Sequence, residues 1–241
     1  MNVGQFSSLF FLILLILLVL IPLNESQRRA RGRRTGRRRS SGTRCRPTTA
    51  DIYGPYYRPS FPRLHRLCSR DASRYRQHAL IVSGYVYERN CRTPIPRVRL
   101  EIWQADRRGK YEGSARCRGF LQTNNNGYYR FLTVHPGKYQ VSYAEALRVA
   151  RMNNRPIGHR WRPAHIHFKV NGRRGHKSLV SQMYFAGDAH LGRNDTCIIC
   201  NSEHSDLVVR PRRSCRRSGC VSHVNFNIVL DRGNGLSINR G

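Results

Sequence analysis

The sequence predicts an all-β fold, a sandwich of short mixed or antiparallel strands that is stapled by disulfides and preceded by an irregular N-terminal arm. Three observations lead to this expectation. Short segments alternate apolar with polar residues, the period of a strand with one buried face, and turn-forming residues separate them. Only 144–152 carries a helical pattern, and that pattern is weak. Eight cysteines, an even number, can supply the staples.

The expected strands follow an irregular segment, 48–62, in which Gly-Pro between tyrosines disfavours both a helix and a central strand. The Thr-Asn-Asn-Asn-Gly sequence at 123–127 is a turn signal between two of the strands. The full set of expected strands is 79–87, 98–103, 120–122, 128–134, 138–143, 165–170, 179–185 and 223–230. A long series of short strands is typical of sandwiches.

The first residues have features of an exported protein. Residues 9–21 form an uninterrupted apolar run, which suits a signal-peptide core and is shorter than the roughly 20 residues of a membrane-spanning helix. We therefore expect 1–26 to be a signal peptide and the protein to be secreted to the extracellular space. No basic residue precedes the run and no Ala-x-Ala follows it, so a short membrane anchor is the alternative.

Arginine dominates the charge of the chain. Lysine and arginine number 44 against 13 acidic residues, which gives a formal net charge of +31. Residues 27–47 are rich in arginine, cannot bury an apolar core and are expected to form a disordered arm. Such charge attracts polyanions non-specifically, although a merely solvated surface is an equally good account. No motif for specific nucleic-acid recognition accompanies the charge.

All eight cysteines follow the apolar run, which suits disulfide formation in an oxidising compartment and leaves their pairing open. Four of them fall in 194–220, which we expect to be a stapled loop before the last strand. The folded domain is expected to span 48–232, with 233–241 as a C-terminal tail. Asn194 begins an Asn-Asp-Thr sequon, which in a eukaryotic protein would allow glycosylation.

A pair of histidines interrupts the apolar strand 165–170. Because side chains alternate along a strand, His165 and His167 project from one face while the apolar residues project from the other. Two imidazoles in this arrangement can bind one metal ion, although such a pair is also common on solvated strands. A metal would need further ligands. Carboxylates are scarce, with 13 in the chain, whereas 12 tyrosines offer phenol oxygens.

Four segments resemble the intradiol ring-cleavage dioxygenase family, in the order in which that family has them. The most specific is Trp-Arg-Pro-Ala-His-Ile-His-Phe at 161–168, which is similar to the iron-binding strand of the family. The others are Gly-Pro-Tyr-Tyr at 54–57, the stretch 98–111 that ends in Gly-Lys-Tyr, and Ser-Gln-Met-Tyr-Phe-Ala-Gly-Asp at 181–188. The resemblance implies an enzyme that cleaves catechols between the two hydroxyl-bearing carbons and inserts both atoms of O2, giving muconate-type products.

The resemblance also implies one Fe(III) ion per chain and a set of site residues. The implied iron ligands are Tyr111, Tyr139, His165 and His167. The implied catalytic residues, which would stabilise negative charge and donate hydrogen bonds, are Arg162 and Gln182. The residues implied to line the substrate pocket are Gly54, Pro55, Tyr56 and Trp103. Tyr143 competes with Tyr139 as a ligand, and either implied tyrosine could instead have a structural role.

The chain also departs from the family. Many relatives dimerise through N-terminal helices for which we see no counterpart, so a monomer is expected. The Cys-rich stretch has no counterpart either, which leaves open which catechol or larger phenolic is the substrate. The rival hypothesis is a cationic extracellular module that binds acidic polysaccharide or membrane surfaces without turnover, and oxygen consumption with catechol would distinguish the two.

Overall fold

The computed structural model describes residues 45–64, 66–68, 78–111, 117–154, 156–173, 175–217 and 219–233, all of which belong to one compact unit that begins at Cys45. The predicted signal peptide 1–26, and most of the predicted arm and tail, lie outside these residues. Within the described ranges, no helix combines the length and the hydropathy that crossing a membrane requires.

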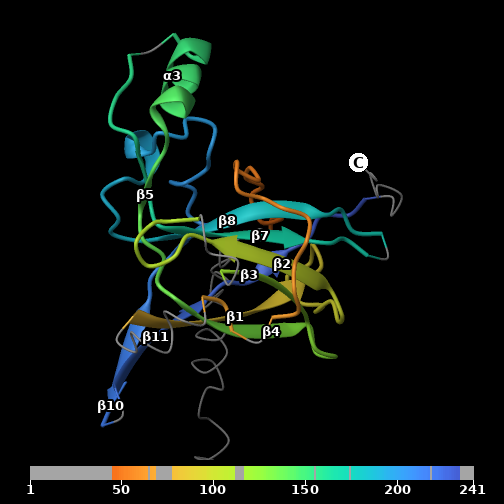
Figure 1. Ribbon diagram of the computed structural model, residues 1–241. Helices are drawn as coiled ribbons and strands as arrows, with labels where there is room; N and C mark the ends of the chain where they lie inside the picture. The colour runs from red at the N-terminus through yellow and green to blue at the C-terminus, as the bar shows by residue number, and fades with distance from the viewer. Residues whose placement is uncertain are drawn as a thin grey trace, which may run out of the picture. The chain divides into compact units, whose positions relative to one another are not determined.

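Two five-stranded sheets lie in separate layers (Figure 1). The first contains β1 (Ala79–Tyr87), β4 (Tyr128–Val134), β10 (Arg212–Arg216), β11 (Gly219–Asn225) and β12 (Ile228–Val229). The second contains β2 (Arg99–Gln104), β3 (Arg118–Gln122), β7 (His165–Val170), β8 (Leu179–Phe185) and β9 (Val208–Val209). β1 pairs antiparallel with β4 and parallel with β11 and β12, whereas β2 and β7 pair antiparallel. The predicted all-β sandwich is confirmed.

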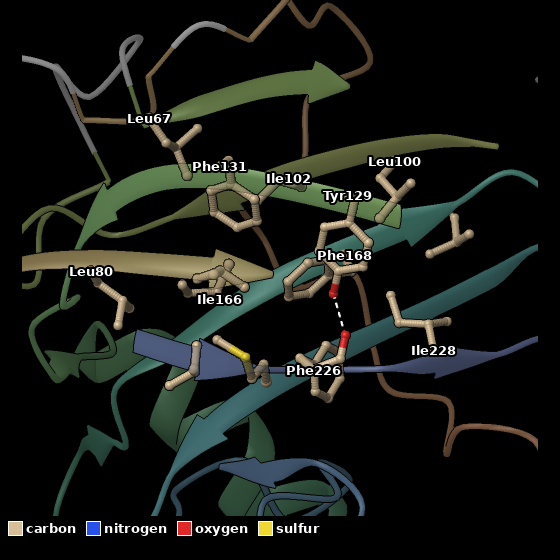
Figure 2. Close-up of a cluster of buried hydrophobic side chains, with 14 of the residues drawn as sticks. Leu67, Leu80, Leu100, Ile102, Tyr129, Phe131, Ile166, Phe168, Phe226 and Ile228 are labelled. Atoms are coloured by element: carbon tan, nitrogen blue, oxygen red, sulfur yellow. Dashed lines mark hydrogen bonds between the residues drawn. The ribbon is translucent and has the colours of Figure 1, made fainter. Parts of the chain in front are cut away.

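The hydrophobic core lies between the two sheets (Figure 2). Alternate residues of β1, among them Leu80, are buried, and they share one cluster with Ile102 of β2 and Phe168 of β7. The ring of Phe168 packs against the rings of Tyr129 and Phe131 from β4 and of Phe226 from the link between β11 and β12. The centroid distances are 5.2 to 6.4 Å. The apolar faces predicted from the alternation therefore meet, and their burial holds the layers together.

A two-stranded sheet and a helix lie outside these layers (Figure 1). The sheet pairs β5 (Tyr139–Gln140) with β6 (Trp161–Arg162), and the helix is α3 (Tyr143–Met152). The predicted strand 138–143 is thus shorter than expected. The helix begins one residue earlier than predicted because Ser142 caps it, its hydroxyl accepting a hydrogen bond of 3.1 Å from the Glu145 N–H.

Part of the predicted loop 194–220 is sheet instead. β9 pairs with β8, and β10 forms a hairpin with β11. Every residue of β10 is exposed, so the strand lacks the apolar alternation by which a sequence reveals a strand. The predicted strand 223–230 divides into β11 and β12, and between them the Asn227 side chain accepts a hydrogen bond from the Tyr85 N–H.

Four disulfides link the eight cysteines, as their even number predicted. The pairs are Cys45–Cys91, Cys68–Cys117, Cys197–Cys200 and Cys215–Cys220. The first pair joins the irregular N-terminal segment to the turn after β1, and the last clamps the β10–β11 hairpin. No cysteine among the described residues is free.

Candidate functional site

Two buried imidazoles from β7 point at each other. His165 and His167 are each 2% exposed, and their Nε2 atoms lie 3.2 Å apart. The Nδ1 of His165 lies 2.6 Å from the Pro163 carbonyl, which accepts its proton and leaves the Nε2 lone pair facing inward. Trp103, paired with His167 across the β2–β7 ladder, stacks on that imidazole with ring centroids 4.7 Å apart. Both rings are therefore held in fixed orientations.

Two tyrosines join the histidines. The phenol oxygen of Tyr111 lies 3.2 Å from His165 Nε2, and the ring of Tyr139 lies 5.6 Å from the His165 ring. The two phenol rings meet edge to face at 5.3 Å, and both residues are buried. The structure thus brings together all four residues that the resemblance implied as ligands. The competitor Tyr143 is 62% exposed on the first turn of α3, and no contact with the histidines is seen for it.

Burial determines the protonation of these donors. Removal from water raises the pKa of Tyr111 well above its usual value and, with partial compensation from the Arg162 cation, raises that of Tyr139. Burial also lowers the pKa of both His165 and His167 well below the usual value. Two neutral phenols and two neutral imidazoles therefore face one another, a set that can hold a cation if the phenols lose their protons.

The spacing of the donor atoms fits a single metal ion. Donors on adjacent coordination positions, each about 2.1 Å from a metal, lie about 3 Å apart. The His165 Nε2 atom lies 3.2 Å from the Tyr111 oxygen and 3.2 Å from His167 Nε2. Within the described part of the chain, no group of three or more His, Cys, Asp and Glu side chains could hold a metal, so a site here depends on the tyrosines.

A buried arginine lies beside the donors. Arg162, 2% exposed, is bound by both oxygens of Asp195, its Nε at 3.0 Å and its Nη2 at 3.1 Å. Its Nη2 also donates to the Gln182 carbonyl oxygen and to the Tyr184 hydroxyl. Burial is the largest single effect and opposes the charge, but the Asp195 carboxylate together with Tyr139 and Tyr184 outweighs it, so the pKa of Arg162 lies well above its usual value. The guanidinium is thus a permanent, fixed cation.

Gln182, the second implied catalytic residue, lies between Arg162 and the segment 51–52. Its amide nitrogen donates to Asp51 Oδ1 at 3.1 Å and to the Ile52 carbonyl at 3.0 Å, and its oxygen accepts from Arg162 and Tyr184. The side chain is fully buried, and both ends of its amide bind protein groups. Gln182 therefore positions Arg162 and the 51–52 backbone.

Sequence reasoning missed the residues that hold Arg162. Asp195 lies in the Cys-rich stretch, and the Tyr184 hydroxyl donates to Asp51 Oδ2 at 2.8 Å. Tyr184 lies within the quoted segment 181–188, but nothing in the sequence predicted a contact with Arg162 for it, for Asp195 or for Asp51. A buried arginine requires a carboxylate partner, and the chain has 13 acidic residues. The sequence could therefore indicate that one of these few carboxylates pairs with Arg162, but not which one.

A pocket of about 290 Å³ opens beside the donors. Of the four residues implied to line it, Pro55 and Tyr56 do so, together with Tyr139 and Arg162. Gly54 lies behind the pocket at a positive φ of 69°, where an added Cβ would stand 3.2 Å from His167 Cε1. Trp103 is fully buried and supports His167 from behind.

Comparison with known sequences identifies the family. A profile of the family described as Dioxygenase matches residues 52–232. The chain belongs to the intradiol ring-cleavage dioxygenase family. It is 31% identical to the chlorocatechol 1,2-dioxygenase of Cupriavidus pinatubonensis over 168 residues, which are 67% of this chain and 62% of that relative. It is 33% identical to the protocatechuate 3,4-dioxygenase beta chain of Burkholderia cepacia over 127 residues, 46% of each chain.

Solved structures of family members have the same fold. The crystal structure of 3-chlorocatechol 1,2-dioxygenase from Rhodococcus opacus 1CP superposes with a TM-score of 0.64 at 25% identity, covering 78% of this chain and 74% of that one. Catechol 1,2-dioxygenase from Acinetobacter sp. ADP1 gives 0.65 at 25% identity, covering 80% and 67%. The present chain thus shares the fold of these structures, yet its sequence match spans less than two thirds of the length of the chlorocatechol relative.

Proposed function

We propose that this family member is a secreted, non-haem Fe(III) intradiol dioxygenase of catechol-type aromatics. The observation that carries the proposal is that the Tyr111 oxygen and His167 Nε2 each lie 3.2 Å from His165 Nε2, with the Tyr139 ring beside them. Relatives named for catechol, chlorocatechol and protocatechuate support the substrate class. The product would be a muconate-type diacid that contains both atoms of one O2.

The donor set favours ferric over ferrous iron. Phenolate oxygen is a hard anionic ligand, and a bound cation lowers a phenol pKa that burial alone raises. Two phenolates from Tyr111 and Tyr139, with two neutral imidazoles, would offset most of the charge of the ion in a buried site. Held by these four residues, a ferric ion would supply the Lewis acid that activates a catechol toward O2.

The residues around the pocket have separate tasks. Tyr139 lines the pocket, and its phenolate oxygen would accept one of the two protons that a catechol loses on binding, while the other would pass to solvent. Arg162, also in the lining, would stabilise the negative charge that remains on the substrate oxygens. Tyr56 stacks on Tyr111 with ring centroids 4.2 Å apart and, with Pro55, covers the donors from the solvent side.

Oxygen uptake tests the proposal. The iron-loaded protein should consume one O2 per catechol and release a muconate that carries both labelled oxygens from 18O2. Tyr139→Phe should reduce this turnover at least a hundredfold, because general acid–base groups contribute factors of roughly 10² to 10⁴. Tyr143→Phe, the same substitution at an exposed position four residues away, should retain full turnover. Tight heparin binding with no oxygen uptake would favour the rival cationic module instead.

The disulfides support secretion, as does the apolar run at 9–21. All four disulfides need an oxidising compartment to persist. The expected signal peptide, 1–26, would deliver the chain there. Expression of the full-length gene product in a secreting host tests this part. The proposal requires the processed protein to appear in the medium with its N-terminus near residue 27. Retention in the membrane would favour the anchor.

A further inference from the structure

The outer half of the pocket has an apolar wall built from two elements. Val149 and Met152 of α3 line one side, and Ile198 and Ile199 line the other. Three of these side chains remain accessible to solvent, with exposures of 74% for Met152, 42% for Ile198 and 69% for Ile199. Large apolar side chains gathered at the mouth of a pocket are a common sign of ligand binding.

Both elements are held in place. Ala146 and Ala150 anchor one face of α3 to the body, which leaves Val149 and Met152 on the pocket side. The Cys197–Cys200 disulfide closes the short loop that carries the two isoleucines. A side chain ordered before a ligand arrives costs less entropy when the ligand binds.

The isoleucine loop is also connected to Arg162. Asp195, whose Oδ1 binds Arg162 Nε, accepts a second hydrogen bond of 2.9 Å on the same oxygen from the Cys197 N–H. The Thr196 hydroxyl donates to the His159 carbonyl at 2.6 Å. The wall is thus fixed relative to the donors deeper in the pocket.

Charge in the pocket favours an apolar group over an anionic one. Among the described residues that line the pocket, three carry charge, namely Glu145, Arg148 and Arg162. Arg148 Nη2 is paired with Glu145 at 3.0 Å, and Arg162 is paired with Asp195. A carboxylate on a substituent that reaches the outer pocket would therefore meet one arginine, Arg148, whose charge Glu145 already offsets.

We propose that Val149, Met152, Ile198 and Ile199 form a specificity wall that receives an apolar substituent of the catechol ring. The inference rests on the proposed dioxygenase function and names its substrate class: catechols that bear an alkyl or aryl group, in preference to bare or carboxylated catechol. The ring would lie among Tyr139, Arg162 and the histidines, and the substituent would extend outward between α3 and the disulfide loop.

The test compares three substrates in the wild type and in two variants. For the iron-loaded wild type, kcat/KM should be about tenfold higher for 4-phenylcatechol than for catechol, and lowest for 3,4-dihydroxybenzoate. In the Ile198→Ser/Ile199→Ser double variant, kcat/KM for 4-phenylcatechol should fall about tenfold more than kcat/KM for catechol. Losing roughly 60 Å² of apolar contact corresponds to such a factor. Tyr143→Ser, on the exposed side of the same helix, should leave the ratio at its wild-type value.

A binding measurement separates this inference from the proposed function. Calorimetry with 4-hydroxybiphenyl, which lacks the second hydroxyl, should show about tenfold weaker binding to the double variant than to wild type. The inference would be wrong if the double variant bound 4-hydroxybiphenyl with the dissociation constant of the wild type. It would also be wrong if the double variant turned over catechol and kept the wild-type ratio of kcat/KM for 4-phenylcatechol to that for catechol. Absence of catechol turnover in both proteins would contradict the proposed function, and the calorimetric difference would then still decide whether the wall binds apolar groups.

Discussion

At the scale of single residues, the site depends on one buried ion pair. The side chains of Arg162 and Asp195 are 3% and 1% exposed, and Asp195 is the only carboxylate that binds this guanidinium among the described residues. A buried pair adds little net stability compared with apolar packing, but removing one partner leaves a charge that water does not reach. Asp195 thereby fixes the position of the cation that faces the pocket.

Asp195→Asn should cost about 3–5 kcal/mol of unfolding free energy, because Arg162 would keep its charge without a carboxylate. Urea denaturation of the purified variant measures this loss. Glu145→Gln is the matched control, since it breaks the Arg148 pair at a site where the arginine side chain is 65% exposed. That change should cost less than about 1 kcal/mol. Equal losses in the two variants would contradict the role of burial.

His135 should make the fold sensitive to acid. Burial lowers the pKa of this histidine below its ordinary value of 6.5. Below about pH 6.5 the unfolded chain takes up a proton that the folded chain refuses, so stability present above that pH is lost as the pH falls toward the folded pKa. The melting temperature of the iron-free protein should therefore drop less between pH 7.5 and 5.5 in His135→Asn than in wild type. The same substitution at exposed His223 should leave the drop unchanged.

At the scale of elements, the strand that carries the two histidines could be predicted from the sequence. The β10 strand and the contact between Asp195 and Arg162 could not. The alternation in 165–170 places His165 and His167 on one face with the apolar residues on the other, and the structure confirms this division. β10 escaped prediction because all its residues are exposed. Asp195 escaped because its partner lies 33 positions away, and a single sequence contains no signal for such a contact.

The helix α3 depends on its cap. Ser142 accepts a hydrogen bond from the Glu145 N–H, and the helix has only two buried residues to hold it against the body. Ser142→Ala should therefore lower the unfolding free energy by about 1 kcal/mol, as loss of a helix cap usually does. Ser205→Ala, an exposed position outside any helix, is the control. Denaturant titration measures both, and a stable Ser142→Ala variant would show that packing alone maintains the helix.

At the scale of the whole molecule, the net charge of +31 predicts non-specific binding to polyanions. The β10 strand presents exposed arginines on a hairpin clamped by Cys215–Cys220. Replacing Arg212, Arg213 and Arg216 with glutamine should therefore lower the salt concentration at which the protein elutes from heparin. Three exposed arginines that lie apart, Arg92, Arg130 and Arg151, make the control triple variant. Equal shifts in the two variants would mean that net charge alone matters.

The central claim is that two phenolates and two imidazoles of one chain hold a single ferric ion, and an optical titration with Fe(III) tests it most directly. Charge transfer from tyrosinate to iron should give a burgundy colour that saturates at one iron per chain. Tyr111→Phe and Tyr139→Phe should each weaken and shift the band, whereas Tyr143→Phe should not. A protein that binds one iron per chain and stays colourless would contradict the account.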